Sequence, residues 1–198
     1  MTYPDFFDKT PTIILQDDLS DFLGTFDDGI IEFNYLDIVK SAGHSCPTVA
    51  GAYLITYYGL KALYKDEELP QRGYIQVEFK EDLEDGVAGV IGSVISNITG
   101  ATVNTGFKGI GGKFNRNDLM FYNSDNNSNV RFTRVDTNKS VDITYDPSSI
   151  GADPMMQPLM QKTMQGIASQ EEKKTFGTLW QQRVEQIFLN SNNIVKVS

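Results

Sequence analysis

The stretch PTVAGAYLITYYGLKALY, from Pro47 to Tyr64, decides the fold of this chain of 198 residues. It predicts a helix, because its proline stands in the first turn, where the missing N–H costs no hydrogen bond. From Val49 to Leu63 the stretch is apolar on almost every side. We therefore expect a helix that runs through the core, with the other elements packed around it.

Length and composition are those of a soluble globular domain with an appended subdomain. Hydrophobic residues make up 40% of the chain and charged residues 22%. No apolar run is long enough to span a membrane, and the N-terminus lacks the basic and apolar regions of a secretory signal. We therefore expect a cytoplasmic protein without membrane contact. The formal net charge of -9 argues against nucleic-acid binding, because phosphates would be repelled.

Residue spacing predicts the elements around the central helix. Residues Tyr74 to Lys80 alternate between apolar and polar, as in a half-buried strand. The apolar positions from Val87 to Ile98 follow helical spacing, and Gly100 ends that helix. Three β-rich segments predict a meander, at residues 118–122, 130–135 and 141–145. The run 30–40 fits both a strand and a helix.

After Asp153 the pattern changes to that of two helices. The first carries Met156, Met160 and Met164 at steps of four, which is typical of a core stripe, with a soft-metal site as the alternative. The apolar positions of the second are Phe176, Leu179, Trp180, Val184, Ile187 and Phe188. We therefore predict an α+β domain over residues 1–150, with its core at about 25–146, and a C-terminal helical extension over 151–198.

The chemistry of the chain points to the pentapeptide from Gly43 to Pro47. It contains the only histidine, His44, and the only cysteine, Cys46. In an irregular loop that enters a helix, these two side chains can converge on one ion. Pro47 in the first turn places Cys46 at the helix start, where free N–H groups and the helix dipole stabilise a thiolate. That thiolate could bind a metal or attack an electrophile.

Several types of site are excluded by the count of residues. A cysteine protease needs a histidine base elsewhere in the fold, and the chain has no second histidine. A closed structural zinc site needs four protein ligands, and the pentapeptide supplies two. Any metal site here is therefore open, or completed by carboxylates, another subunit or a bound molecule. A purely structural role for the pentapeptide is the alternative.

These residues resemble a known family. The segment from Gly43 to Pro47, followed by a helix of small residues, is similar to the Gly-His-x-Cys-Pro signature of the FmdE-like family of formylmethanofuran dehydrogenase proteins. The turn from Thr99 to Thr102 resembles that family's Thr-Gly-Cys-Thr turn, and residues 112–113 resemble its Gly-Lys before a strand. The resemblance runs from Ile30 to Tyr122.

The resemblance implies helices packed on a mixed or antiparallel sheet, and a homodimer. It also implies that His44 and Cys46 are metal ligands, with zinc as the expected ion. Family members often have cysteines where this chain has Val90 and Ala101, and an aspartate where it has Ser93. A metal site that uses those three positions is not available here, so the chain resembles a divergent branch.

Other residues are weaker candidates for binding a cofactor or substrate. The glycine-rich segment 105–113 lacks the spacing of a phosphate loop and predicts a turn, with Lys108 or Lys113 as an anion contact otherwise. Tyr53 follows the pentapeptide on the central helix and could line a pocket above Cys46, although most tyrosines there are expected in the core.

Three functions remain open at this point. The first is a metal-dependent enzyme or accessory subunit of a redox or one-carbon system, with a small-molecule ligand or a redox-enzyme partner and with Cys46 as the candidate catalytic residue. The second is a module that binds haem or another cofactor through His44 or Cys46. The third is a structural interaction subunit. In each case we expect a homodimer, with the apolar face of the last helix at or near the interface.

Overall fold

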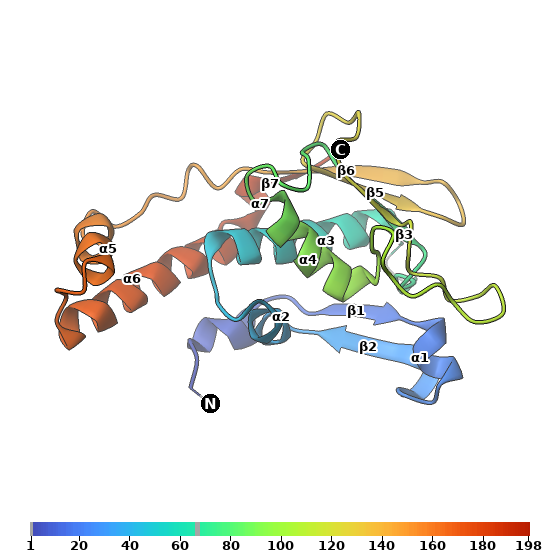
Figure 1. Cartoon of the computed structure of the whole chain (residues 1–198), viewed down its shortest axis with the longest axis horizontal. Helices are drawn as coiled ribbons and strands as arrows, with labels where there is room; N and C mark the ends of the chain where they lie inside the picture. The colour runs from blue at the N-terminus through green and yellow to red at the C-terminus, as the bar shows by residue number, and fades with distance from the viewer. Residues whose placement is uncertain (1, 66–67) are drawn as a thin grey trace.

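Figure 1 shows the computed structural model of the chain, which describes residues 2–65 and 68–198. In chain order its elements are η1 (Asp5–Lys9), β1 (Ile13–Gln16), α1 (Asp18–Phe22), η2 (Asp27–Gly29), β2 (Ile30–Phe33), α2 (Tyr35–Ala42), α3 (Pro47–Leu63), β3 (Ile75–Phe79), α4 (Ala88–Thr99), β4 (Met120–Phe121), β5 (Val130–Arg134), β6 (Ser140–Tyr145), α5 (Met156–Met164), α6 (Gln170–Leu189), α7 (Ser191–Ile194) and β7 (Val195–Val197). Within these residues, none of the helices has both the length and the apolar content needed to cross a bilayer.

Helix α3 lies at the centre of the molecule, as its sequence predicts. It packs on strands β5, β6 and β7 and is also contacted by α2, α4 and α6 (Figure 1). Its side chains from Val49 to Ile55 are fully or almost fully buried. Pro47 begins the helix and Cys46 caps it. The expected helix through the core is therefore confirmed.

Two glycines of α3 let aromatic rings of the sheet reach the helix backbone. A Cβ atom on Gly51 would lie 2.4 Å from the ring of Tyr145, the last residue of β6. A Cβ atom on Gly59 would lie 2.7 Å from the ring of Phe132 in β5. Glycine inside a helix costs about 0.5–1 kcal/mol, and burial of a large aromatic side chain offsets that cost. The two glycines thus set how closely sheet and helix pack.

The strands form two sheets in an α+β fold, which confirms the predicted fold class. Strands β1 and β2 pair antiparallel, and the larger sheet has the order β4-β3-β5-β6-β7. This larger sheet is mixed, because β4 runs parallel to β3 while the other neighbours are antiparallel.

The predicted meander is wrong in one of its pairings. Strands β5 and β6 form a hairpin as expected, but β4 does not pair with β5. Strand β3 lies between them, with Val77 opposite Met120 on one edge and opposite Phe132 on the other. The full-length ladder to β5 occupies one edge of β3, so the two-residue strand β4 is left with the other edge.

The ambiguous run 30–40 contains both a strand and a helix. Strand β2 ends at Phe33, and Asn34 then begins α2 with a capping box. The Asn34 side chain accepts from the Asp37 N–H at 3.0 Å, and the Asp37 carboxylate accepts from the Asn34 N–H at 3.2 Å. This reciprocal cap satisfies two N–H groups and separates the two elements.

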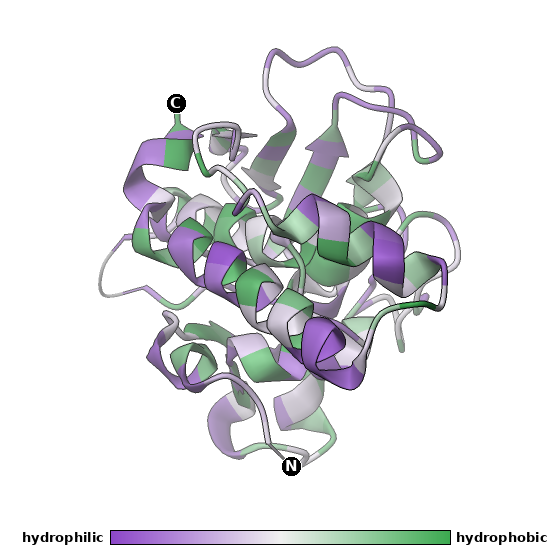
Figure 2. Cartoon of the chain, turned by 90° about the vertical axis from the view of Figure 1, so that its left-hand side faces the viewer, coloured by the Kyte–Doolittle hydropathy of each residue, from purple (hydrophilic) through white to green (hydrophobic). Residues whose placement is uncertain are grey.

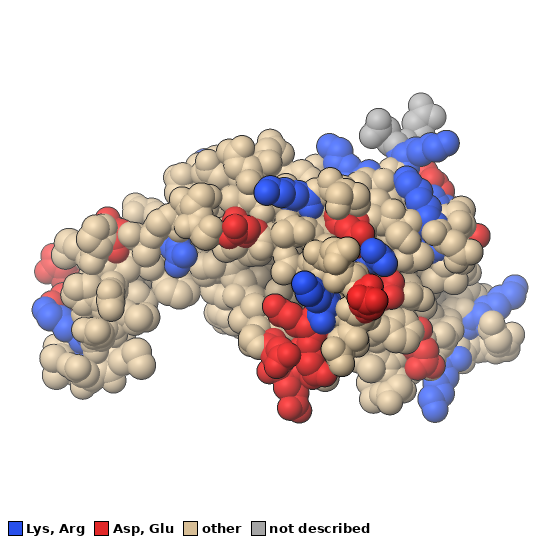
Figure 3. Space-filling model, turned by 90° about the horizontal axis from the view of Figure 1, so that it is seen from above, with Lys and Arg blue, Asp and Glu red and all other residues tan. Residues whose placement is uncertain are grey.

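The C-terminal segment forms the two predicted helices and then returns to the main sheet. Helix α5 and the first half of α6, residues 153–179, project from the body and form what we call the arm (Figures 1 and 3). Beyond the arm, Val184 and Ile187 are buried in the main core, and β7 pairs with β6. The sequence pattern does not predict this last strand.

Figure 2 looks toward the arm and shows apolar positions beside polar ones on its surface. The methionine spacing of α5 does not give a core stripe, because Met156 is buried whereas Met164 is 82% exposed. Met160 and Ile167 are exposed as well. The arm therefore presents apolar side chains to solvent.

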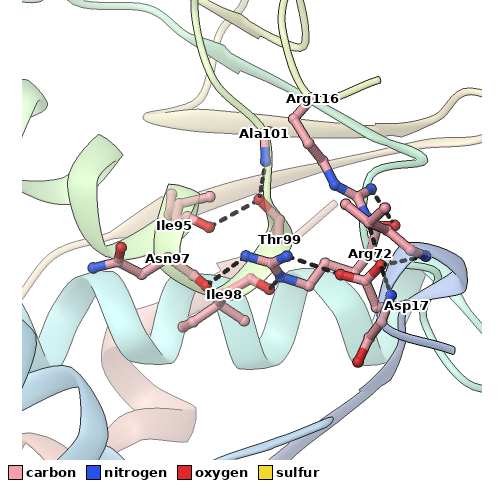
Figure 4. A network of polar contacts seen from close by, with 10 residues as sticks. Asp17, Arg72, Ile95, Asn97, Ile98, Thr99, Ala101 and Arg116 are labelled. Atoms are coloured by element: carbon pink, nitrogen blue, oxygen red, sulfur yellow. Dashed lines mark hydrogen bonds and ion pairs between the residues drawn. The ribbon is translucent and has the colours of Figure 1, made fainter. Parts of the chain in front are cut away.

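A buried ion network ties the N-terminal hairpin to the rest of the domain (Figure 4). Asp17 is 2% exposed and caps α1. The Arg72 guanidinium donates to Asp17 Oδ2 at 2.9 Å, and the Arg116 guanidinium donates to Asp17 Oδ1 at 2.6 Å. Arg72 also donates to the carbonyls of Asn97 and Ile98 near the end of α4. One carboxylate thus joins segments that are distant in the sequence.

The two arginines keep Asp17 charged. Burial alone would raise the pKa of Asp17, but the hydrogen bond from Arg72 and the positive charges of Arg116 and Arg72 outweigh it, so the pKa lies below its ordinary value. A depressed carboxylate pKa contributes stability above the unfolded value of about 4, and that stability is lost as the pH falls through the folded pKa.

We predict that Asp17→Asn lowers the free energy of unfolding by about 3–5 kcal/mol at neutral pH, because it leaves Arg116 buried without a counter-charge. Urea unfolding monitored by circular dichroism measures the change. The control is Asp142→Asn, which breaks the more exposed pair with Arg131 and should cost about 1 kcal/mol or less. Equal losses in the two variants would contradict the assignment.

Candidate functional site

The pentapeptide from Gly43 to Pro47 is the loop between α2 and α3. Gly43 ends α2, and Cys46 is the N-cap of α3. The Cys46 Sγ accepts a hydrogen bond from the Val49 N–H at 3.4 Å, so the sulfur occupies the place that a capping oxygen usually takes. A negative charge on that sulfur would face the positive end of the helix dipole. The predicted position of Cys46 is thus what the structure shows.

His44 is exposed on the same loop. Its Nδ1 lies 3.0 Å from the carbonyl oxygen of Ala42. Since a carbonyl oxygen only accepts, Nδ1 carries the proton in this contact and Nε2 keeps its lone pair. The ring is therefore held in the tautomer that can bind a metal through Nε2.

Ser45 anchors the loop to two neighbouring helices. Its hydroxyl lies 3.0 Å from the hydroxyl of Tyr35 in α2. Its carbonyl oxygen accepts from the Trp180 indole N–H at 3.0 Å and from the Gln181 side-chain amide at 3.2 Å, both in α6. Ser45 itself is buried. The loop is thus fixed from within while His44 points outward.

Two buried tyrosines contact this loop. Tyr35 contacts Ser45, and the Tyr145 hydroxyl donates to the Pro47 carbonyl at 3.0 Å. Burial raises the pKa of both phenols well above the ordinary value, and the proximity of Cys46 raises it further. Both tyrosines therefore stay protonated at neutral pH and remain hydrogen-bond donors.

The loop is also connected to α4. The Asn97 side-chain amide donates to the Ser41 hydroxyl at 2.7 Å, two residues before Gly43. The Asn97 carbonyl in turn accepts from the Arg72 guanidinium. The pentapeptide and the ion network of Figure 4 are thus joined through the end of α4.

The loop alone does not close a metal site. Among residues 2–65 and 68–198 there is no group of three or more histidine, cysteine, aspartate or glutamate side chains placed to hold a metal ion. His44 and Cys46 are therefore two donors without a third of these types nearby. The position that the resemblance associates with a further cysteine, Ala101, is buried in the core behind the turn that ends α4.

The weaker candidates lie elsewhere. The Tyr53 hydroxyl is bonded to the carbonyls of Pro11 and Phe33, and the side chain is fully buried. Lys108 and Lys113 are exposed on the glycine-rich loop, which is pinned to the Thr102 and Arg116 backbone. In the part of the chain that the structure describes, no hydrogen bond or ion pair joins these three residues to the pentapeptide.

Sequence reasoning misses the residues that hold the loop. Trp180 and Gln181 lie 135 and 136 positions from Ser45, so no local pattern links them. The helical spacing marks Trp180 only as part of an apolar face. The pattern predicts Tyr145 in a strand, but its contact with the loop depends on the glycine at position 51, which is visible only once helix and sheet are packed.

Comparison with models of protein families matches residues 42–195 to the family described as "FmdE, Molybdenum formylmethanofuran dehydrogenase operon". The matched segment begins immediately before the pentapeptide, ends in β7, and covers more than three quarters of the chain. A search of curated proteins finds no match.

We predict that Gly51→Ala destabilises the protein by about 1–3 kcal/mol, because the added methyl group would collide with the Tyr145 ring beside the loop. The matched control is Gly177→Ala in α6, where a Cβ atom meets nothing within 4 Å. That variant should gain about 0.5–1 kcal/mol from the better helix propensity of alanine. Thermal unfolding of both variants compares them, and opposite signs are expected.

Proposed function

The chain belongs to the FmdE family, and from this premise we propose that it is a metal-binding accessory protein of a redox or one-carbon enzyme system. His44 and Cys46 are the protein ligands of an open site for one divalent ion, expected to be zinc. The family description links such proteins to a formylmethanofuran dehydrogenase operon. The proposal for this chain is narrower, since it concerns its own two donors.

The hydrogen bond from His44 Nδ1 to the Ala42 carbonyl carries this proposal. Histidines that bind metals through one ring nitrogen usually donate the other N–H to a carbonyl or carboxylate, which fixes tautomer and ring orientation. Here the partner is a backbone carbonyl at the end of α2, and Nε2 is left free on an exposed side chain. The loop thus presents a nitrogen donor and a sulfur donor two residues apart.

The chemistry of the donor set fits zinc. Zinc is borderline soft, accepts nitrogen and sulfur ligands, and is four-coordinate in most protein sites. With two protein ligands, two positions remain for water, a bound molecule or a group from another subunit. The Gln181 Oε1 is buried next to Ser45 without a partner among the described residues, and it could accept a hydrogen bond from a metal-bound water.

We predict that the purified protein binds one zinc ion per chain and that His44→Ala and Cys46→Ser each abolish this stoichiometric binding. The fold should be retained, since the loop is anchored through Ser45 and Pro47 and not through these two side chains. Elemental analysis after gel filtration measures zinc, and circular dichroism measures folding. Ser41→Ala, in the same loop region but without a proposed ligand, is the control.

The same sample tests the two other functions. A Soret band in the absorption spectrum would identify haem in place of zinc. Absence of both zinc and haem, or retention of zinc by both variants, would leave the pentapeptide with a structural role only.

We further propose that the protein is a homodimer in which the arm contacts a second copy. Only Met156 and Leu159 of the arm are buried hydrophobic residues, which is a small core for a projecting helix pair. Met164 is 82% exposed and Ile167 is 68% exposed. The arm surface carries few charges over much of its length (Figure 3). Val184 and Ile187, expected at the interface, are used by the chain's own core.

We predict that the parent protein sediments with twice the mass of one chain at micromolar concentration. The double substitution Met164→Glu and Ile167→Glu should convert it to a monomer, because charges would be buried without partners at the contact. Leu189→Glu, at an exposed apolar position of α6 outside the arm, is the control and should remain dimeric. A monomeric parent protein refutes the dimer and leaves the metal proposal standing.

A further inference from the structure

A cavity of about 240 Å³ lies beside the first turn of α3, next to Cys46. Ile55, Val87 and Ile91 form its apolar wall, and Thr48, Asn129 and Tyr145 form its polar end. An apolar cavity of about 150 Å³ accommodates benzene, so this one has room for a benzene ring with a small substituent. The family match assigns this cavity no role, and the proposed metal ligands do not line it.

The polar end of the cavity is held by the fold. The Tyr145 hydroxyl donates to the Pro47 carbonyl at 3.0 Å, and the Tyr145 N–H donates to Asn129 Oδ1 at 2.9 Å. The ring rests on Gly51, where a Cβ atom would displace it. Three independent contacts thus fix one aromatic wall, so the cavity exists before any ligand enters.

Hydrogen-bond donors without acceptors converge on this polar end. Thr48 follows Pro47 in the first turn of α3, where N–H groups have no partner within the helix. Neither its N–H nor its hydroxyl has an acceptor among the described residues, and the Asn129 side-chain NH₂ has none there either. A ligand oxygen that accepts hydrogen bonds would satisfy these donors.

Charge at the cavity disfavours anions. Of the residues that line it, all within the described part of the chain, Glu81 alone is charged. The exposed acids Asp82, Glu84 and Asp85 follow directly in the sequence. A carboxylate ligand would meet this negative charge, whereas an uncharged carbonyl group would not.

We propose that this cavity binds a small uncharged molecule, with its apolar body against Ile55 and Ile91 and its carbonyl oxygen toward the Thr48 N–H. Because Thr48 is two residues from Cys46, the bound molecule lies next to the proposed metal site. Binding itself does not need the metal, so the inference goes beyond the proposed function and is tested separately from it.

The test uses metal-free, ¹⁵N-labelled full-length protein titrated with benzamide, benzoate and benzylamine, followed by amide resonances in NMR spectra. Benzamide should shift the Thr48 resonance and those of the cavity wall. Benzoate and benzylamine should each bind at least about tenfold more weakly, the first because of Glu81 and the second because it lacks an acceptor oxygen. Glu81→Gln should narrow the gap between benzoate and benzamide.

Ile91→Trp fills the cavity and should weaken benzamide binding at least about tenfold. Val90→Trp is the matched control, since Val90 is the preceding residue of α4, is exposed and does not line the cavity. If circular dichroism shows that Ile91→Trp does not fold, Val87→Trp at the cavity rim replaces it. The proposal is overturned if benzamide leaves the Thr48 resonance unmoved, if the filled variant binds as well as the parent, or if benzoate or benzylamine binds as tightly as benzamide.

The outcomes separate the two proposals. Benzamide binding that persists in Cys46→Ser, together with loss of zinc, supports both. Benzamide binding in a protein that takes up no zinc supports the cavity alone. Zinc binding without any benzamide effect supports the metal site alone.

Discussion

The fold depends on one constraint: α3 is apolar on nearly every side and must be covered on every side. At about 25 cal/mol for each Å² of apolar surface buried, leaving even one face of such a helix in water would cost several kcal/mol, which is comparable with the stability of a whole domain. The sheet covers α3 through Phe132 and Tyr145, whose rings lie against Gly59 and Gly51. Helices α2, α4 and α6 cover the rest. The close approach at Gly51 also delivers Tyr145 to the loop before α3, so core packing and site geometry share one contact.

The loop from Gly43 to Pro47 is rigid in its backbone and open in its chemistry. Ser45 and Pro47 receive hydrogen bonds from α2, α6 and the end of β6, while the His44 side chain stays exposed. Such a division suits a site that must hold its donors in place and still admit another ligand, because the cost of ordering the loop is met by the fold. Trp180 and Gln181 bond to Ser45 just beyond the arm, so the arm is connected to the loop through α6. The cavity beside Thr48 extends the same region.

Electrostatics organise the C-terminal end of α4. A buried ion pair is a weak source of net stability, because desolvation of the charges offsets most of their attraction. What the network of Asp17, Arg72 and Arg116 provides is registration: it connects the N-terminal hairpin, the end of α4 and the segment after the glycine-rich loop. The Arg116 Nε remains buried without a partner in the described part of the chain, so the arrangement is sensitive to any loss of Asp17. The turn after α4 that resembles the family motif lies beside this network.

From the sequence alone, local physics determined α3, α4, β3 and the two C-terminal helices, since each has its own apolar period, proline or glycine signal within a few residues. The same applies to Cys46 at the helix start and to the family resemblance of its loop. Only the tertiary structure decided that β4 pairs with β3, that β7 closes the sheet, that Asp17 meets arginines 55 and 99 residues away, and that Trp180 holds Ser45 across 135 residues. These partners are chosen by the packing of elements around α3, and no short window of sequence carries information about a contact whose two sides are so far apart.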